Sequence, residues 1–328
     1  MKIRAIKLYE TGSPENMKWE EIELGEISND EVLIKHTAVG FNLIDTYHRG
    51  GIYPTPKKPC GLGTEASGIV EKVGKNITSF AIGDRVAYAG SGAGLGAYCY
   101  KRIMNTSGLI KIPDWMDDKT AAAILTKGRT VEYLFNRTYS LKEGDNILFH
   151  AAAGGVGLIA GQWAKAIGVN AIGIVGSESK IQIAKDSGYS QVFAMDDEDI
   201  KTKIMDLTKG VGVDVVYDSV GKTTWDLSLS CVKKLGLVVS FGSASGNPPA
   251  YDVAVDGVKN SAYIHRATMV NYMTTPEISL ASAMKVFEMI KEGSIVLQIN
   301  DSYTLDDVVK VHEDAEARLT TGQIVMTV

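Results

Sequence analysis

The sequence predicts an α/β chain: a doubly wound parallel sheet preceded by a region rich in strands and turns. From Asp145 to about Gly242, short runs of β-branched residues alternate with helical stretches. This alternation is typical of parallel strands joined by right-handed crossover helices. Before about residue 120, strand-like runs such as Glu31–Val39 and Ser67–Val73 follow one another between turns. The change in pattern indicates two structural regions, as expected for 328 residues.

The expected elements can be bounded from these patterns. The apolar runs predict parallel strands at Asn146–Phe149, Ala171–Val175, Gln191–Ala194, Val213–Tyr217 and Leu237–Phe241. Further expected elements are a strand at Ala97–Ile103, helices at Asn42–Arg49, Lys119–Thr138, Pro276–Glu292 and Leu305–Leu319, and a last strand at Gln323–Val328. The helix at 119–138 joins the two regions, and Gly128 is expected to weaken or bend it.

A glycine-rich turn, Ala151-Ala-Ala-Gly-Gly-Val-Gly157, follows the first expected parallel strand and precedes a helix starting near Gly155. Glycines allow a backbone to approach phosphates closely, and the N–H groups of a helix N-terminus attract negative charge. We therefore expect Gly154, Gly155 and Val156 to hold a dinucleotide pyrophosphate in a Rossmann unit. The alternative is an ordinary tight turn, since this is a variant of the strict Gly-x-Gly-x-x-Gly pattern.

The loop after the second expected strand bears on the choice of dinucleotide. An NAD site places Asp or Glu about 20 residues after the glycine turn, where it holds the ribose 2′-OH. Here that place falls on Gly176, followed by Ser177, Ser179 and Lys180. Hydroxyls and an ammonium group donate hydrogen bonds to a 2′-phosphate, so this loop predicts that the coenzyme is NADPH. Two alternatives remain: Glu178 could turn inward to a ribose diol, and Lys180 could be a solvated lysine opening a helix at 179–187.

Composition narrows the class of protein. The chain is 45% hydrophobic and 22% charged with a formal net charge of -5, so nucleic-acid binding through a basic surface is not expected. The three cysteines are distant in sequence and form no Cys-x-x-Cys pair, which favours a reducing cytoplasm. The N-terminus lacks the apolar core of a signal peptide, and no apolar run is long enough to predict a membrane span.

Several further motifs carry a family resemblance along nearly the whole chain. They are Val39-Gly-Phe-Asn-Leu-Ile-Asp-Thr-Tyr47, Gly61-Leu-Gly-Thr-Glu-Ala-Ser-Gly68 with Gly74, Gly83-Asp-Arg-Val86, Lys127-Gly-Arg-Thr130, the glycine turn, Tyr217-Asp-Ser-Val-Gly221 and Ser240-Phe-Gly-Ser243. The chain resembles the quinone oxidoreductases in the zinc-free, zeta-crystallin-like branch of the medium-chain dehydrogenase/reductase superfamily. The resemblance implies a GroES-like, partly open β-barrel catalytic domain at 1–123 and 270–328. A Rossmann NADPH-binding domain would be inserted at 124–269, with the active site in the cleft.

The residues at the zinc positions of related enzymes argue against a metal. Zinc-dependent relatives use a thiolate and an imidazole where this sequence has Asn42 and Thr64. An amide and a hydroxyl are poor Zn²⁺ ligands beside those groups. The four-cysteine lobe of those relatives is missing too, so no metal is expected. Without a metal to polarise an alcohol, a substrate that accepts hydride readily fits better.

The resemblance also implies roles for individual residues. It places four side chains beside the nicotinamide and substrate: Asn42, Asp45, Tyr47 and Tyr53. Further cofactor contacts are expected from Asn42, Lys127, Thr130, Ser219, Phe241, Gly242, Ser243 and Arg318. The alternatives are aromatic packing for both tyrosines, a simple turn around Ser219, and an exposed cation in the last helix for Arg318. Met195 stands where close relatives often have a tyrosine near the adenosine phosphate, which leaves that contact in doubt.

These observations predict an NADPH-dependent quinone reductase that works without a metal, by hydride (or electron) transfer from the cofactor. Donors near the acceptor oxygen would stabilise its developing charge. The nearer alternative is an NADPH-dependent enone or alkenal double-bond reductase, and the more distant one is a non-catalytic NADPH-binding protein. A homodimer formed through the Rossmann domains is expected from the family and from the frequency of two-fold dimers. The physiological acceptor, and the choice between one- and two-electron reduction, are left open by the sequence.

Overall fold

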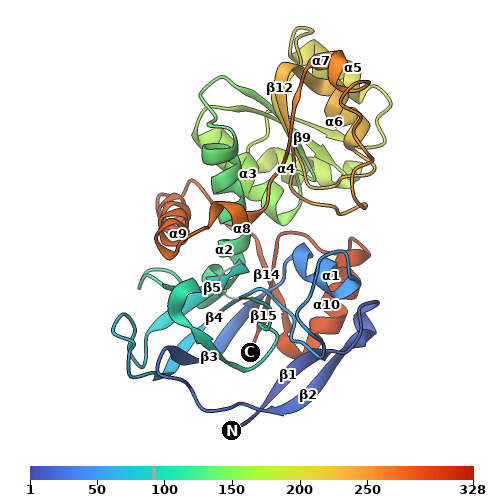
Figure 1. Cartoon of the computed structure of the whole chain (residues 1–328). Coiled ribbons are helices and arrows are strands. Elements are labelled where there is room, and N and C mark those ends of the chain that lie inside the picture. Colours follow the sequence, from blue (N-terminus) through green and yellow to red (C-terminus); the bar gives the residue numbers. More distant parts are fainter. Residues whose placement is uncertain (91–93) are drawn as a thin grey trace. The chain divides into compact units, whose positions relative to one another are not determined.

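A six-stranded parallel sheet forms one part of the chain, in a computed structural model that describes residues 1–90 and 94–328 (Figure 1). Its strand order is β10-β9-β8-β11-β12-β13, and every neighbouring pair is parallel. The strands are β8 (Asn146–His150), β9 (Asn170–Val175), β10 (Gln191–Ala194), β11 (Val213–Asp218), β12 (Val232–Ser240) and β13 (Tyr263–Arg266). The order reverses between β8 and β11, which is the point where such sheets bind ligands. The predicted doubly wound fold is confirmed.

Helices follow these strands in the alternating pattern that the sequence predicts. They are α3 (Gly155–Ala166), α4 (Ile181–Asp186) after the short η5 (Glu178–Lys180), α5 (Ile200–Leu207) and α6 (Trp225–Cys231). Helix α3 contacts α4, and α5 contacts α6. The core beneath α5 and α6 includes Leu148, Ile172, Val216 and Trp225. Two short helices, α7 (Gly257–Asn260) and α8 (Met269–Tyr272), flank β13.

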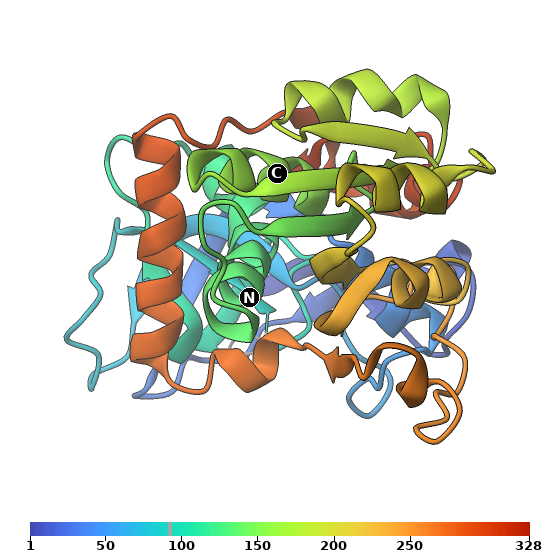
Figure 2. The same ribbon diagram turned by 90° about the horizontal axis from the view of Figure 1, so that it is seen from above.

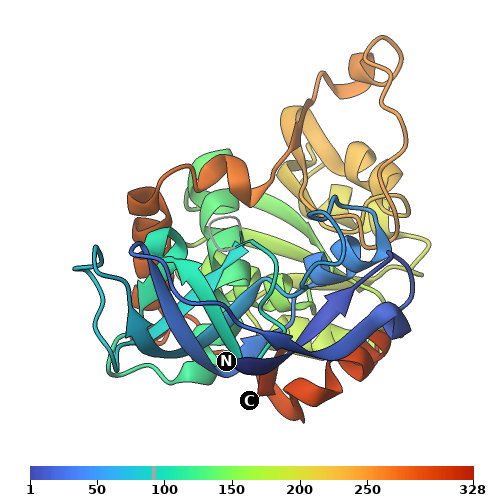
Figure 3. The ribbon, with the colours of Figure 1, turned by 60° about the horizontal axis from the view of Figure 1, so that its bottom comes forward.

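A second, mostly antiparallel sheet has seven strands, in the order β14-β15-β3-β4-β5-β7 with β6 also paired to β3. Its strands are β3 (Glu31–Gly40), β4 (Glu65–Val73), β5 (Arg85–Ala89), β6 (Lys101–Asn105), β7 (Leu109–Lys111), β14 (Ile299–Thr304) and β15 (Gln323–Thr327). A separate antiparallel pair, β1 (Lys2–Leu8) and β2 (Met17–Glu23), is drawn in dark blue in Figure 3. The three-residue segments η1 (Pro14–Asn16) and η3 (Thr106–Gly108) are short 3-10 turns.

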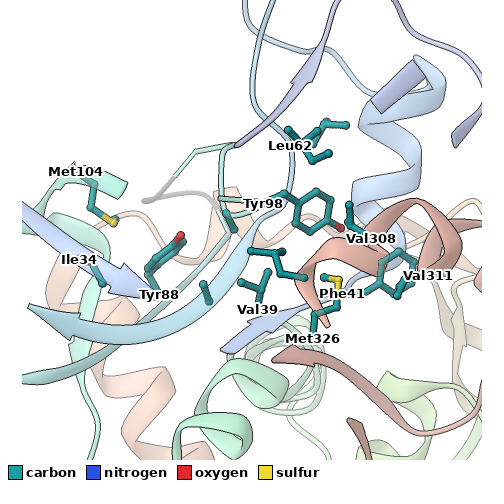
Figure 4. Close-up of a cluster of buried hydrophobic side chains, with 14 of the residues drawn as sticks. Ile34, Val39, Phe41, Leu62, Tyr88, Tyr98, Met104, Val308, Val311 and Met326 are labelled. Carbon is teal, nitrogen blue, oxygen red and sulfur yellow. The ribbon is translucent and has the colours of Figure 1, made fainter. Parts of the chain in front are cut away.

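The hydrophobic core of this second sheet also receives α10 (Val308–Glu316), after the short η6 (Leu305–Asp307), and Phe41, which lies just before α1 (Leu43–Gly50). Figure 4 shows Phe41 and Tyr98 beside Val308 and Val311 of α10. These four side chains are each less than 5% exposed. Segments far apart in the sequence therefore share one core, which holds the start of α1 in place.

Helix α2 (Asp118–Tyr133) continues into a π-helical turn, η4 (Leu134–Thr138). A Cβ on Gly128 would lie 2.5 Å from the side chain of Val286 in α9 (Pro276–Lys291), which Figure 2 shows as one uninterrupted helix. Gly128 therefore allows close packing against α9. Helix α2 continues through Gly128 and becomes irregular only after Tyr133.

The chain divides into two compact units. Unit 1 consists of Met1–Arg129, Tyr272–Val286 and Leu297–Val328, and unit 2 consists of Thr130–Asn271 and Phe287–Val296. Both chain ends belong to unit 1. Among the described residues, none of the helices has the length and apolar character needed to cross a bilayer.

Three expected elements differ from the structure. The strand expected at Ala97–Ile103 begins only at Lys101, because Cys99 forms an isolated bridge with Ala5 instead. Strand β12 begins at Val232, five residues before its expected start. The last helix ends at Glu316, so the prediction that Arg318 lies in it is wrong. Arg318 has a left-handed φ of 59° and is exposed.

Candidate functional site

The glycine turn of unit 2 connects β8 to α3 through a backbone that requires small residues. Ala151 has a φ of 55°, and a Cβ on Gly157 would lie 2.4 Å from the Ala151 carbonyl oxygen. Such an approach excludes any side chain at Gly157. Gly154 is the N-cap of α3 and supplies no side-chain cap, and Gly155 and Val156 form the first turn of the helix. The predicted residues thus lie at a helix N-terminus whose N-cap glycine has no side chain, and helix N-termini are the kind of site that binds anions.

The loop after β9 offers room and hydrogen-bond donors. Gly176 is exposed, and a Cβ built on it would have no other atom within 4 Å. The hydroxyls of Ser177 and Ser179 lie 3.0 Å apart, and Lys180 ends the short η5 turn. Glu178, the carboxylate in this segment, is exposed. Two hydroxyls and an ammonium group suit a phosphate monoester better than a ribose diol.

The loops after β11 and β12 lie side by side because the two strands are paired. A Cβ on Gly242 would lie 2.4 Å from the Ser219 carbonyl oxygen, so these predicted residues are in contact. Ser243 is buried, and its hydroxyl donates to the Asn247 side chain at 3.0 Å. Phe241 packs on Phe149 of β8, with ring centroids 5.7 Å apart. Strands β8, β11 and β12 thus bring the glycine turn, Ser219 and Phe241–Ser243 to one edge of the sheet.

A buried carboxylate, Asp218, organises this edge. It is fully buried and accepts the backbone N–H groups of Val220 at 2.8 Å and Gly221 at 2.9 Å. The hydroxyls of Thr224 and Ser228 also donate to it, each at 2.8 Å. Val220 and Gly221 directly follow Ser219, so their bonds to Asp218 hold the loop that carries it, while Thr224 and Ser228 tie Asp218 to α6. Sequence analysis did not assign Asp218 a role, although a carboxylate ending a buried strand was the available signal.

Arg266 on β13 was missed as well, because that strand was not expected. Its guanidinium donates to the Ser240 hydroxyl at 2.8 Å and to the Gly242 carbonyl at 2.9 Å. It therefore fixes the end of β12, where Phe241–Ser243 begin. Met195, where a tyrosine was expected, packs against the apolar core of unit 2 and donates its backbone N–H to Val175 at 2.8 Å.

In unit 1, the predicted residue Asn42 is the N-cap of α1 and is 3% exposed. Its Nδ2 donates to Glu65 Oε2 at 2.7 Å and lies 3.3 Å from the Thr126 hydroxyl. Asn42 and Asp45 are arranged as a capping box, in which Asp45 Oδ2 accepts the Asn42 backbone N–H at 3.0 Å. The Asp45 N–H bonds instead to the Asn42 carbonyl at 2.9 Å. Within residues 1–90 and 94–328, Asn42 Oδ1 has no hydrogen-bond partner.

Asp45 is fully buried and its carboxylate accepts three hydrogen bonds. Besides the Asn42 N–H, it accepts the hydroxyls of Thr64 and Tyr98, each at 2.9 Å. Burial raises its pKa to about 6, with a smaller contribution from Glu65, while the three donors act in the opposite direction. These contacts place Asp45 as a support for the start of α1.

A directed chain of hydrogen bonds leads from Asp45 to α10. Arg49 can only donate, so its Nε–H fixes His312 Nδ1, 3.3 Å away, as an acceptor. The neutral ring then carries its proton on Nε2, which faces the Tyr98 oxygen at 3.0 Å, while Tyr98 donates to Asp45. Burial lowers the pKa of His312 to about 3, helped by the Arg49 guanidinium, so the ring is neutral at pH 7. Glu316 pairs with the same guanidinium.

Tyr47 and Tyr53 pack edge-on, with ring centroids 5.3 Å apart, and the Tyr53 N–H donates to the Tyr47 carbonyl at 3.1 Å. Tyr47 is 8% exposed, and Tyr53 is half-buried. The two rings therefore support each other at the end of α1. Packing, which sequence analysis weighed as an alternative, accounts for part of their role.

Lys127 is buried on α2, and its ammonium donates to the Phe41 carbonyl at 3.0 Å. Burial lowers its pKa, while the carboxylates of Glu65 and Asp45 act in the opposite direction. Thr130, three residues further along α2, is 8% exposed and belongs to unit 2. The ammonium of Lys127 thus lies in a region with two buried carboxylates and the Asn42 amide.

At the positions where zinc-dependent relatives hold their metal, this chain has an amide and a hydroxyl that are already hydrogen-bonded to carboxylates. Asn42 bonds to Glu65, and Thr64 bonds to Asp45. No cluster of three or more His, Cys, Asp or Glu side chains arranged to hold a metal occurs in the described part of the chain.

Comparison with known proteins agrees with this geometry. Residues 28–114 match the family model of the alcohol dehydrogenase GroES-like domain, and residues 155–283 match that of the zinc-binding dehydrogenases. A quinone oxidoreductase from Pseudomonas aeruginosa is 43% identical over 98% of this chain and 99% of its own length. The chain belongs to the quinone oxidoreductases. It is thus a member of the medium-chain dehydrogenase/reductase superfamily, as the resemblance implied.

Two further relatives bear on the coenzyme and on the substrate. The crystal structure of Escherichia coli quinone oxidoreductase complexed with NADPH superposes with a TM-score of 0.95 at 39% identity, over 99% of this chain and all of that one. A 2-haloacrylate reductase from a Burkholderia species is 35% identical over 99% of this chain and 98% of its own length. The predicted combination of a Rossmann sheet with a GroES-like domain is confirmed by these matches.

Proposed function

We propose that this chain is an NADPH-dependent quinone reductase. The observation that carries the proposal is the loop after β9, where open space at Gly176 adjoins two serine hydroxyls and Lys180. That loop fits a 2′-phosphate, and the glycine turn fits the pyrophosphate, since a Cβ at Gly157 would collide with the backbone. The full-length likeness to quinone oxidoreductases, one of them crystallised with NADPH, supports the same assignment.

The proposal gives each group of residues a task. Gly154–Val156 would hold the pyrophosphate, and Gly176, Ser177 and Lys180 the 2′-phosphate. The nicotinamide half would meet Ser219, Phe241–Ser243, Asn42, Lys127 and Thr130, with Arg318 a further contact by resemblance. Tyr47 and Tyr53 would contact the substrate ring, and Asp45 would hold the start of α1. When bound, the coenzyme supplies hydride from C4 of the dihydronicotinamide.

The protein's contribution to catalysis is then binding and electrostatics. A quinone that accepts hydride develops negative charge on oxygen, and nearby hydroxyls or the Lys127 ammonium lower the energy of that charge. The neighbouring His312 is neutral, and burial raises the pKa of Tyr98 well above its usual range. Asp45, whose pKa is about 6, is fully buried and already accepts three hydrogen bonds, so we propose that water protonates the product.

We also propose that the reaction needs no metal, because an amide and a hydroxyl already bonded to carboxylates are poor Zn²⁺ ligands. We also propose that residues 1–123 and 270–328 form the GroES-like catalytic domain and residues 124–269 the Rossmann domain. A reducing cytoplasmic location is supported by Cys60, Cys99 and Cys231, which are all buried free thiols.

A homodimer formed through unit 2 is a further proposal. Strand β13 is the edge of the parallel sheet among the described strands, and its Tyr263 and Ile264 are 64% and 37% exposed. Val253 and Val258 beside it are also exposed. An exposed apolar strand edge invites pairing with another strand, and a two-fold partner satisfies both copies at once.

The decisive experiment is NADPH oxidation with a panel of orthoquinones, paraquinones and enals, together with calorimetric titration of NADPH and NADH. We expect tighter binding of NADPH and turnover with quinones. Turnover with enals alone would favour the double-bond reductase, a candidate that the 2-haloacrylate reductase relative supports. Tight NADPH binding without any turnover would overturn the enzyme assignment and favour a binding protein.

A further inference from the structure

The Asn42 amide presents two different ends to its surroundings. Its nitrogen is engaged with Glu65 at 2.7 Å and lies near the Thr126 hydroxyl, whereas its oxygen has no hydrogen-bond partner in the described part of the chain. The side chain is almost completely buried. A buried acceptor without a partner is costly, so such an atom in a native protein needs a donor from outside the chain, such as a ligand.

Glu65 determines which end of the amide faces which way. It is the first residue of β4 and is fully buried. Its Oε1 accepts the backbone N–H of Thr126 at 3.0 Å, which leaves Oε2 to meet Asn42. Both Glu65 oxygens accept from N–H groups, so the carboxylate draws in the Asn42 amide nitrogen and the amide oxygen is turned away.

The chemistry of the possible partners identifies the ligand. A quinone carries carbonyl oxygens, which only accept, and so it cannot donate to Asn42 Oδ1. The Asp45 N–H, which faces the Asn42 side chain in the capping box, makes its hydrogen bond to the Asn42 main-chain carbonyl at 2.9 Å. The nicotinamide half of the coenzyme, in contrast, carries hydrogen-bond donors, namely a carboxamide NH₂ and ribose hydroxyls.

We propose that Glu65 is a positioning residue that fixes Asn42 as a hydrogen-bond acceptor for the coenzyme. Asn42 then cannot donate to the developing substrate oxygen, so that task falls to other groups. Glu65 touches neither substrate nor coenzyme in this scheme and acts through the Asn42 amide. The inference rests on the proposed NADPH-dependent function, and it adds a residue that sequence analysis passed over.

Replacing Glu65 by glutamine reverses the polarity of this contact without changing its shape. In Glu65→Gln, the new Oε1 can still accept the Thr126 N–H, while the new Nε2 donates to Asn42 Oδ1. The Asn42 amide must then turn its NH₂ toward the coenzyme, so the coenzyme donor loses its acceptor. We expect the Kd of NADPH, measured by calorimetry without any acceptor, to rise about tenfold, the usual effect of one lost buried hydrogen bond.

A second substitution should restore binding. In Glu65→Gln/Asn42→Asp, one oxygen of the new carboxylate accepts from the glutamine NH₂ and the other is again an acceptor. We expect NADPH affinity to recover to within about threefold of wild type, although Asn42→Asp alone weakens it by placing two carboxylates together. A Glu65 that only stabilised the fold would give losses that add, and additive losses would overturn the proposal.

Glu132→Gln provides the matched control, since Glu132 is also a buried glutamate and lies outside this cluster. It should leave the Kd of NADPH unchanged. Failure of the wild type to bind NADPH would overturn the proposed function, whereas tight wild-type binding that Glu65→Gln leaves intact would overturn only the role of Glu65. Should Glu65→Gln not fold, neutron diffraction of the wild type can show the orientation of the Asn42 side-chain amide. Asn42 deuterons that point away from Glu65 would contradict the proposal.

Discussion

Replacing His312 by glutamine should make the stability of unit 1 less sensitive to acid. His312 has a folded-state pKa of about 3, against about 6.5 for an exposed histidine, because it is buried and lies beside Arg49. As the pH falls, the unfolded chain therefore binds the proton first. The stability that His312 contributes is present above pH 6.5 and is lost progressively between pH 6.5 and 3.

The expected magnitude follows from the two pKa values. A pH of 5 is 1.5 units below the pKa of about 6.5 of the unfolded histidine. The free energy of unfolding is therefore about 2 kcal/mol lower at pH 5 than at pH 7. Glutamine does not titrate, so His312→Gln should lose about 2 kcal/mol less than wild type over this interval. At pH 7 the variant itself should be about 1–3 kcal/mol less stable, because glutamine does not fill the space of the buried imidazole ring between Arg49 and Tyr98.

The assay is urea unfolding at pH 7 and pH 5, followed by hydrogen exchange in peptides of unit 1. Reading unit 1 alone matters, because a chain of two compact units need not unfold in one step. His265→Gln, on β13 of unit 2, serves as the control and should leave the pH dependence of unit 1 unchanged. An equal loss from pH 7 to pH 5 in wild type and His312→Gln would refute the buried neutral histidine.

Four other outcomes are expected. Lys180→Ala should raise the KM for NADPH about tenfold and leave that for NADH nearly unchanged, with Lys185→Ala as control; equal effects on both coenzymes would contradict the phosphate assignment. Gly157→Ala should destabilise unit 2 by about 1–3 kcal/mol in thermal unfolding and weaken NADPH binding, since its Cβ would lie 2.4 Å from a carbonyl oxygen; an unchanged Tm would count against this backbone geometry. Chelators should not change activity, and stoichiometric zinc in active protein would refute metal independence. Light scattering at micromolar concentration should give twice the chain mass, and disruption by Ile264→Lys would support pairing through β13, whereas a monomeric wild type would exclude it.

The parallel sheet was predictable because its strands leave a strong local signal. Strands buried on both faces appear as short β-branched runs, and β10 was bounded to the residue. The predicted strand was shorter than β12 because the residues at its start, Lys233, Lys234, Leu235 and Gly236, resemble a turn. Leu235 does have a left-handed φ of 59°. Strand β13 has only four residues and is mostly exposed, so it shows no alternation of buried and exposed positions that would have marked it in the sequence.

The buried polar network of unit 1 was not predictable for a different reason. Arg49, Tyr98 and His312 meet although as many as 263 positions separate them. No periodicity or short motif encodes a contact at that separation. The glycine turn and the loop after β9, in contrast, are short segments whose residue types alone state the chemistry they can perform.

Asp45 opposes His312 in its response to acid, and the hydrogen-bond chain shows where its proton can go. With a folded-state pKa of about 6, Asp45 gains stability as the pH falls, about 1 kcal/mol between pH 7 and 5. Oδ2 cannot take the proton, because it receives both the Asn42 N–H and the Tyr98 hydroxyl, and Tyr98 cannot reverse while His312 Nε2–H faces it. The proton must therefore sit on Oδ1, where the Thr64 hydroxyl can turn from donor to acceptor. This gain is smaller than the loss at His312, so these two groups together make unit 1 less stable in acid.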